Sequence, residues 1–215
     1  ANLEQEIKVA ISQPTEPHGT LSIRLPETVS LYFFPELLRA FQSRFPKVKL
    51  ELINCSYFDL PEELKAGIID LGFLIIDDYQ TKDQITEKIR SIPLAMVTHP
   101  SHAPILKTPG GMYQLLDEPL ILPSNDCSYV QVLERILVEH KVKIPVVWHL
   151  NSLAAIKQTI ISGAGCSVLP EIAIREEVET GKLIIIPWEK QHLAVNLMMV
   201  WQRNKWLPPV QQAFM

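Results

Sequence analysis

The sequence predicts an α/β protein made of two doubly wound halves. Short apolar stretches typical of strands alternate along the 215 residues with stretches of helical periodicity. This alternation occurs twice, over 19–91 and over 92–192, and a further strand-like stretch follows at 193–201. Chains in which strands and helices alternate build parallel sheets with right-handed crossovers, so we expect two such subdomains, with the late strand returning to the first.

The first half begins with a strand and an amphipathic helix. A polar helix is expected over 2–12, and the stretch 20–25 then alternates, with Leu21, Ile23 and Leu25 on one face. Apolar residues next recur in steps of three and four, which predicts one helix with a single apolar face: Leu31, Phe34, Leu38, Phe41 and Phe45. Pro35 falls in its first turns, where a missing amide N–H costs little, and Pro46 ends it.

The first half continues with a strand, a helix and a buried strand. Apolar and charged residues alternate over 48–52, which predicts a half-buried strand. A helix is expected from Asp59, with Glu62 three residues later as a capping box, and Gly67 closes it. The continuous apolar stretch 68–75 is typical of a strand buried on both faces.

The second half repeats the pattern with more elements. Asn151 and Ser152 are expected to cap a helix, and Gly163-Ala164-Gly165 reads as a tight turn into a buried strand. Pro208-Pro209 begin a last helix. Strands are predicted at 92–99, 119–123, 145–150, 166–170, 183–188 and 193–201, and helices at 129–141, 153–162 and 171–180.

Composition and charge exclude several classes of protein. With 47% hydrophobic and 20% charged residues the chain has the composition of a folded domain. A net charge of −4 supplies no basic field for nucleic acid, so any DNA contact is expected outside these residues. No apolar stretch reaches the roughly 18–20 residues that span a bilayer. Three cysteines without a CxxC pair favour reduced thiols and a cytoplasmic location over disulfides or a zinc site.

Catalytic and metal-binding motifs are sparse. The sequence has no phosphate-binding loop, no GxSxG and no HExxH. His99 and His102 are three residues apart, but Pro100 and Pro104 favour a loop over a metal-binding helix. Asp77-Asp78 is interpreted as a solvated turn, and His149 as a packed histidine. We therefore expect no enzymatic activity, no metal and no cofactor.

Small polar residues gather where predicted strands end. Any one of them could be a simple cap or turn residue. Ligands of doubly wound sheets bind beyond the carboxyl ends of the strands, and two facing sheets enclose a cleft there. Taken together, the polar residues predict such a cleft: Glu27, Thr28 and Ser30; Asn54, Ser56 and Tyr57; Ser124, Asn125, Asp126 and Ser128; and Asn151 and Ser152.

Three segments resemble a known family when taken in order. They are GTLSIRLPETVSLYFFPELLRAFQSRFPKVKLEL (19–52), ELKAGIIDLGFLI (63–75) and ISGAGCSVLPEIAI (161–174). In this order and spacing they resemble the effector-binding domain of LysR-type transcriptional regulators, over the whole of residues 1–215. Cys166 stands where that family commonly has isoleucine.

The resemblance implies a fold, partners and an architecture. The fold would be two Rossmann-like α/β subdomains joined by crossover strands, as in type II periplasmic binding proteins. Residues 1–18 would end a linker helix, 19–91 plus 193–215 would form subdomain I, and 92–192 would form subdomain II. The family binds a small, often anionic, metabolite between its subdomains and forms homodimers and homotetramers. It contacts DNA through an N-terminal winged helix-turn-helix, which is expected to lie outside this chain.

The resemblance also implies site residues. Thr28 stands where the family has an effector-binding serine or threonine, and Tyr57 stands at the next polar loop, where many members have a smaller hydroxyl. Cys127 and Ser128 match the loop that lines the cleft from subdomain II. Peroxide-sensing members place a reactive cysteine near Cys127, but the resolving cysteine would fall near Ile136, which disfavours a disulfide switch. The effector site is predicted to comprise Glu27, Thr28, Val29, Tyr57, Asn125, Asp126, Cys127, Ser128 and Asn151.

Two other functions remain open from the sequence. A free-standing solute-binding protein of the same fold would be supported by a cleaved signal peptide before Ala1, although the helical, acidic start weighs against it. A small enzyme on this scaffold is disfavoured because no acid–base or nucleophile pair converges. For the regulator, an effector would act by shifting the population of subdomain arrangements.

Overall fold

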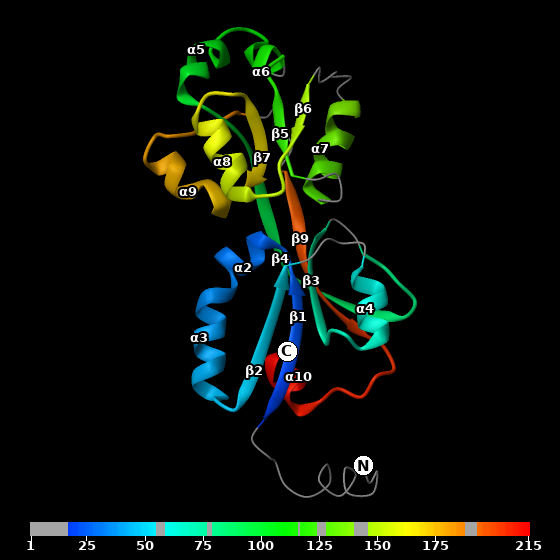
Figure 1. Ribbon diagram of the computed structural model, residues 1–215. Coiled ribbons are helices and arrows are strands. Elements are labelled where there is room, and N and C mark those ends of the chain that lie inside the picture. Colours follow the sequence, from blue (N-terminus) through cyan, green and yellow to red (C-terminus); the bar gives the residue numbers. More distant parts are fainter. Residues whose placement is uncertain are drawn as a thin grey trace, which may run out of the picture.

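The computed structural model describes residues 17–54, 59–76, 79–115, 117–123, 128–139, 146–187 and 193–215. These residues form a mixed sheet with helices on its faces, drawn out into two lobes (Figure 1). The strands follow the order β2-β1-β3-β9-β4-β7-β5-β6, and β8 pairs with β4. The α/β class predicted from the alternation of elements is confirmed.

The first lobe holds the early elements and the last helix. It consists of β1 (Gly19–Leu25), α2 (Glu27–Tyr32), α3 (Phe34–Arg44), β2 (Val48–Asn54), α4 (Leu60–Ala66), β3 (Leu71–Ile76) and α10 (Pro209–Phe214). Strand β1 pairs in parallel with β2 and with β3. Leu21, Ile23 and Leu25 are fully buried, as the alternation in β1 predicts.

The second lobe holds the middle of the chain. It consists of η1 (Pro100–His102), α5 (Ala103–Leu106), α6 (Gly111–Leu115), β5 (Leu120–Leu122), α7 (Ser128–Glu139), β6 (Val147–His149), α8 (Leu153–Ile161), β7 (Cys166–Pro170), α9 (Glu171–Glu179) and β8 (Ile184–Ile185). Strand β5 lies parallel to β6 and to β7. The predicted helices at 129–141, 153–162 and 171–180 are confirmed as α7, α8 and α9 to within two residues at the ends that the structure describes.

Two long strands, β4 (Gln84–Thr98) and β9 (Ala194–Gln202), connect the lobes. They pair antiparallel from Gln84 opposite Gln202 to Pro93 opposite Ala194, with a register shift between Lys88 and Arg90. Beyond this pairing β4 continues along β7, while β9 also pairs with β3. Because β4 belongs to both lobes, it is a crossover strand, and the predicted stretch 92–99 is only its second half.

The helix predicted through Leu31 and Phe45 is wrong as a single element. It is two helices, α2 and α3, separated at Phe33. Pro35 has no amide N–H to donate to the carbonyl of Leu31, and its ring would clash with that carbonyl, so the helix restarts. Leu31 consequently falls on α2 and is 51% exposed, whereas Phe34 and Phe41 on α3 are buried.

Three other boundaries differ from the predictions. The strand predicted from Ile68 begins at Leu71, because Gly67 ends α4 at φ +70° and Ile68 still belongs to that turn, donating its N–H to the Glu63 carbonyl. The side chain of Asp59 makes no cap hydrogen bond to α4, so the capping box is not formed. The loop predicted after 92–99 contains three short helices, η1, α5 and α6. Residues 2–12 and Asp77-Asp78 lie outside the described residues.

The C-terminal helix packs into the core of the first lobe. The ring of Phe214 on α10 lies 5.0 Å from that of Phe41 and 6.0 Å from that of Phe34, and Phe34 meets Phe73 of β3 edge to face at 5.0 Å. These aromatic contacts hold α10 and α3 together beside β3. Within the described part of the chain, no helix combines the length and the apolar character that crossing a membrane requires.

Candidate functional site

Helix α2 lies at the junction of the two lobes. Strand β1 ends at Leu25, and Pro26 caps α2 with extended backbone while its carbonyl accepts the N–H groups of Val29 and Ser30. Proline suits this position because it lacks the N–H that a helix start leaves unpaired. The six-residue helix therefore begins directly at the carboxyl end of β1, next to the second lobe (Figure 1).

Glu27, the first residue of α2, reaches across to the second lobe. Its Oε2 atom accepts the backbone N–H of Leu153 at 3.0 Å. Leu153 is the first residue of α8, whose N-cap is Ser152. A carboxylate at this point is favoured by the unpaired N–H groups and the positive end of the helix dipole. The contact joins the carboxyl ends of β1 and β6, which belong to different lobes.

The residues that follow Glu27 on α2 are Thr28, Val29 and Ser30. Thr28 is only 5% exposed, and Val29 is fully buried in a hydrophobic core cluster that contains residues of both lobes. Ser30 donates its hydroxyl to the Glu27 carbonyl oxygen at 2.8 Å. Of the predicted residues on α2, Glu27 faces the second lobe and Val29 packs away into the core.

Of the other predicted site residues, only some lie in the part of the chain that the structure describes. Asn151 is exposed in the bend between β6 and α8, directly before the cap Ser152. Tyr57, Asn125, Asp126 and Cys127 lie outside the described residues, and Ser128 is described only as the first residue of α7. His149, predicted as a packed histidine, is instead exposed, with its Nδ1 atom 2.9 Å from the Pro123 carbonyl oxygen. Its short edge strand leaves one side of the ring in solvent.

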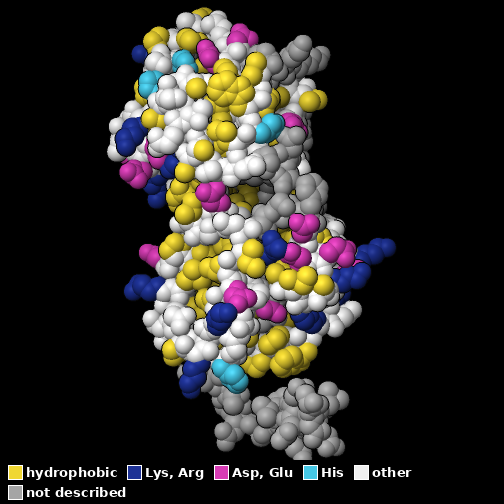
Figure 2. Space-filling model, viewed as in Figure 1, with side chains coloured by type: hydrophobic (Ala, Val, Ile, Leu, Met, Phe, Trp, Pro, Cys, Tyr) yellow, Lys and Arg dark blue, Asp and Glu magenta, His cyan; other side chains and the backbone are white. Residues whose placement is uncertain are grey.

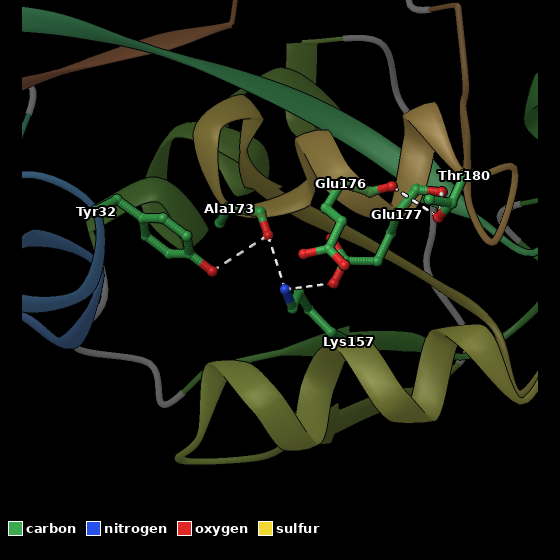
Figure 3. A network of polar contacts seen from close by, with 6 residues as sticks. All are labelled: Tyr32, Lys157, Ala173, Glu176, Glu177 and Thr180. Atoms are coloured by element: carbon green, nitrogen blue, oxygen red, sulfur yellow. Dashed lines mark hydrogen bonds and ion pairs between the residues drawn. The ribbon is translucent and has the colours of Figure 1, made fainter.

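A second contact between the lobes comes from the other end of α2. Tyr32 donates its hydroxyl to the Ala173 carbonyl oxygen of α9 at 3.4 Å, and Lys157 of α8 donates to the same oxygen at 3.0 Å (Figure 3). Lys157 also forms an ion pair with Glu177 at 2.5 Å, with only 17% and 11% of the two side chains exposed. The network has no signature in the sequence, because residues on α2, α8 and α9 meet only in the folded chain.

The environment of Lys157 keeps its ammonium charged. Burial acts to lower the pKa of Lys157, but the hydrogen bond and charge of Glu177 and the neighbouring Tyr32 hydroxyl outweigh it, so the pKa is raised. Both ends of α2 are thus attached to the second lobe by charged or polar groups.

A groove of about 470 Å³ lies between α2–α3 and α9. Acidic and hydrophobic side chains meet on the face where the lobes join (Figure 2). The groove is lined by Leu31, Tyr32, Phe33, Pro35 and Glu36 from the first lobe and by Ile172, Arg175, Glu176 and Glu179 from the second.

Cys166, His99 and His102 have defined surroundings in the described part of the chain. Cys166 is fully buried in β7, and burial, with the charge of Glu118, raises its pKa to about 12, so the thiol stays protonated and unreactive. Among the described residues no three histidine, cysteine or acidic side chains gather as metal ligands. The Nδ1 atoms of His99 and His102 lie 2.8 and 2.7 Å from the hydroxyls of Ser101 and Thr98.

Comparisons with known proteins agree with this arrangement. The LysR substrate binding domain family matches residues 14–215. An uncharacterized HTH-type transcriptional regulator, YwqM of Bacillus subtilis, is 28% identical over 214 residues, which cover 99% of this chain and 72% of the relative. The HTH-type transcriptional activator CmpR of Synechocystis is 26% identical over 188 residues, covering 87% of this chain and 62% of the relative.

Solved structures show the same fold. The Synechocystis CcmR regulatory domain in complex with 2-PG superposes with a TM-score of 0.77 at 21% identity, covering 92% of this chain and 94% of that one. The reduced regulatory domain of OxyR2 from Vibrio vulnificus superposes with a TM-score of 0.73 at 20% identity, covering 90% and 91%.

Proposed function

Because the chain belongs to the LysR substrate-binding domain family, we propose that it is the ligand-sensing regulatory domain of a transcription factor, with a small-molecule effector bound between its lobes. The observation that carries the proposal is the contact from Glu27 to the start of α8, which brings together the carboxyl ends of β1 and β6. Strand ends of this kind are where α/β folds bind ligands. Glu27, Thr28 and Asn151 are the described residues assigned to the site.

The proposal includes boundaries for two subdomains. We assign residues 19–91 with 193–215 to regulatory subdomain I and 92–192 to subdomain II, while the end of a linker helix expected over 1–18 falls mostly outside the described residues. The subdomains adopt two arrangements that differ by a rotation about β4 and β9. The effector shifts the population between them only as far as its affinities for the two arrangements differ. The domain works in the cytoplasm, DNA is contacted by a winged helix-turn-helix outside these 215 residues, and no reaction is assigned to the domain.

Apolar strand edges support a homodimer. In the described sheet the outermost strands are β2 and β6, and both carry exposed apolar side chains: Leu52, Ile53, Val147 and Trp148. Unpaired apolar edges are sites of association between chains. Light scattering at micromolar concentration is expected to give twice the 24.4 kDa mass of one chain. The Trp148→Lys variant is expected to shift that mass toward one chain, and a wild-type mass of 24.4 kDa would contradict the dimer.

Thr28→Ala is expected to weaken effector binding about tenfold, because it removes one hydrogen bond to the effector. A tenfold change in affinity corresponds to about 1.4 kcal/mol. An effector is first identified by a saturable rise in melting temperature across a panel of small metabolites. Calorimetry then compares the variant with Thr20→Ala, a matched change at an exposed residue at the opposite end of β1. Both variants should fold, and unchanged affinity in Thr28→Ala would remove Thr28 from the site.

A further inference from the structure

We propose that Glu27 selects the chemical class of the effector, favouring ligands with a primary ammonium or another N–H donor over carboxylates and phosphates. The inference rests on the proposed function, since it concerns the same cleft. It departs from the anionic metabolite that the resemblance to LysR-type regulators implies.

Two of the first three N–H groups of α8 already donate to the protein's own side chains. The first N–H group, that of Leu153, donates to Glu27 Oε2 at 3.0 Å, and the N–H of Ala155 donates to the Ser152 hydroxyl at 3.4 Å. These N–H groups are among those that a carboxylate or phosphate would use at a helix N-terminus. An anionic ligand that takes the Leu153 N–H must displace Glu27, and at any N–H group of this turn its charge is repelled by that carboxylate.

Glu27 retains capacity to accept from a ligand. Among the described residues no lysine or arginine forms an ion pair with Glu27, and its Oε1 atom has no hydrogen-bond partner there. The side chain is half-buried. A half-buried carboxylate that has one oxygen open and no ion-pair partner in the described part of the chain favours a ligand that brings a positive N–H donor, because charge-assisted hydrogen bonds are the stronger kind.

The far end of α2 restricts how Glu27 can move. Tyr32, the last residue of this six-residue helix, is hydrogen-bonded to the Ala173 carbonyl oxygen of α9. The contact holds the backbone of α2 in place, so Glu27 can leave the Leu153 N–H only by changing its own side-chain rotamer and giving up that hydrogen bond. The carboxylate thus stays beside the start of α8 as a negative element against anionic ligands, and an unpaired charge placed in this way creates specificity.

The first test uses sulfate as the anionic probe and the backbone amide of Leu153 as the reporter. In ¹⁵N-labelled protein, the Leu153 amide signal of the wild type is expected to show no saturable shift with sulfate. Glu27→Gln keeps an acceptor oxygen and removes the charge, so it should bind sulfate at this amide at least tenfold more tightly. Glu87→Gln, the same change at an exposed residue of β4, should behave as the wild type. Equal sulfate response in wild type and Glu27→Gln would overturn the proposal.

The second test uses two sets of small metabolites in thermal melting. One set has primary amines without carboxylates or phosphates, and the other has carboxylates and phosphates without amines. Amines are expected to raise the melting temperature of the wild type and of Glu87→Gln, with at least tenfold weaker binding to Glu27→Gln. Anions that stabilise the wild type and Glu27→Gln equally would overturn the proposal. No binding from either set would contradict the proposed ligand-sensing function, while the sulfate titration still decides the role of Glu27.

Discussion

Gly165→Ala is expected to cost about 3–5 kcal/mol of unfolding free energy. A Cβ atom at Gly165 would lie 2.1 Å from the Pro119 carbonyl oxygen, which also accepts the Cys166 N–H at 3.0 Å. The oxygen belongs to backbone that enters β5, so it cannot turn aside as a flexible side chain can. Gly165 also has φ +148°, which residues with a Cβ rarely adopt. The clash lies between β7 and β5, where the second lobe is assembled.

Chemical denaturation followed by circular dichroism measures this cost. Gly181→Ala is the matched control, because Gly181 also has a positive φ, +70°, but a Cβ there has nothing within 4 Å. The free energy of unfolding of the control is expected to fall by only about 1 kcal/mol, because the substitution there adds backbone strain and no clash. A Gly165→Ala protein within about 1 kcal/mol of the control would show that Pro119 can move away.

Lys157→Met is expected to cost about 3 kcal/mol, because it leaves Glu177 buried without its cation. Lys157 also holds the Ala173 carbonyl oxygen that Tyr32 contacts from the first lobe. Combining Lys157→Met with Glu177→Leu removes both charges, so the double variant should recover at least half of the lost free energy. A double variant as unstable as the sum of the two single changes would contradict a coupled pair.

The control and the pH dependence follow from the same electrostatics. Lys49 and Glu51 form an exposed ion pair, so Lys49→Met should leave the unfolding free energy close to that of the wild type.

The pKa of Lys157 is raised in the folded state above its unfolded value of about 10.4. The contribution of Lys157 to the free energy of unfolding should therefore be complete below about pH 10, and it should be lost as the pH rises through the folded-state pKa.

Much of the fold could be predicted from local patterns. The alternation in β1 identified Leu21, Ile23 and Leu25 as buried, and Ser152 was correctly expected to cap α8. The break at Phe33 was missed, because periodicity continues through it and only the absent N–H of Pro35 interrupts the helix. The first half of β4 was missed because most of its residues are exposed and three are charged. It is ordered by pairing with β9, more than 100 residues later in the sequence.

The site could be predicted as residues but not as contacts. Glu27 and Asn151 were identified separately, since each follows a predicted strand. That Glu27 itself accepts the N–H of Leu153, 126 residues away, depends on how β4 and β9 set the two lobes. Lys157 and Glu177 carry no local signal, because a charged residue on a helix is most often solvated, and their partial burial arises only when α8 packs beside α9.

Binding of an effector between the lobes is tested most directly by mapping amide shift changes in ¹⁵N-labelled protein. The mapping uses the ligand that raises the melting temperature. The amides of Thr28 at the end of β1 and of Leu153 at the start of α8 are both expected to shift with the same saturation curve, because one ligand contacts both lobes. Shifts confined to one lobe, or centred on Arg175 in the groove beside α9, would place the ligand elsewhere and contradict the cleft as the effector site.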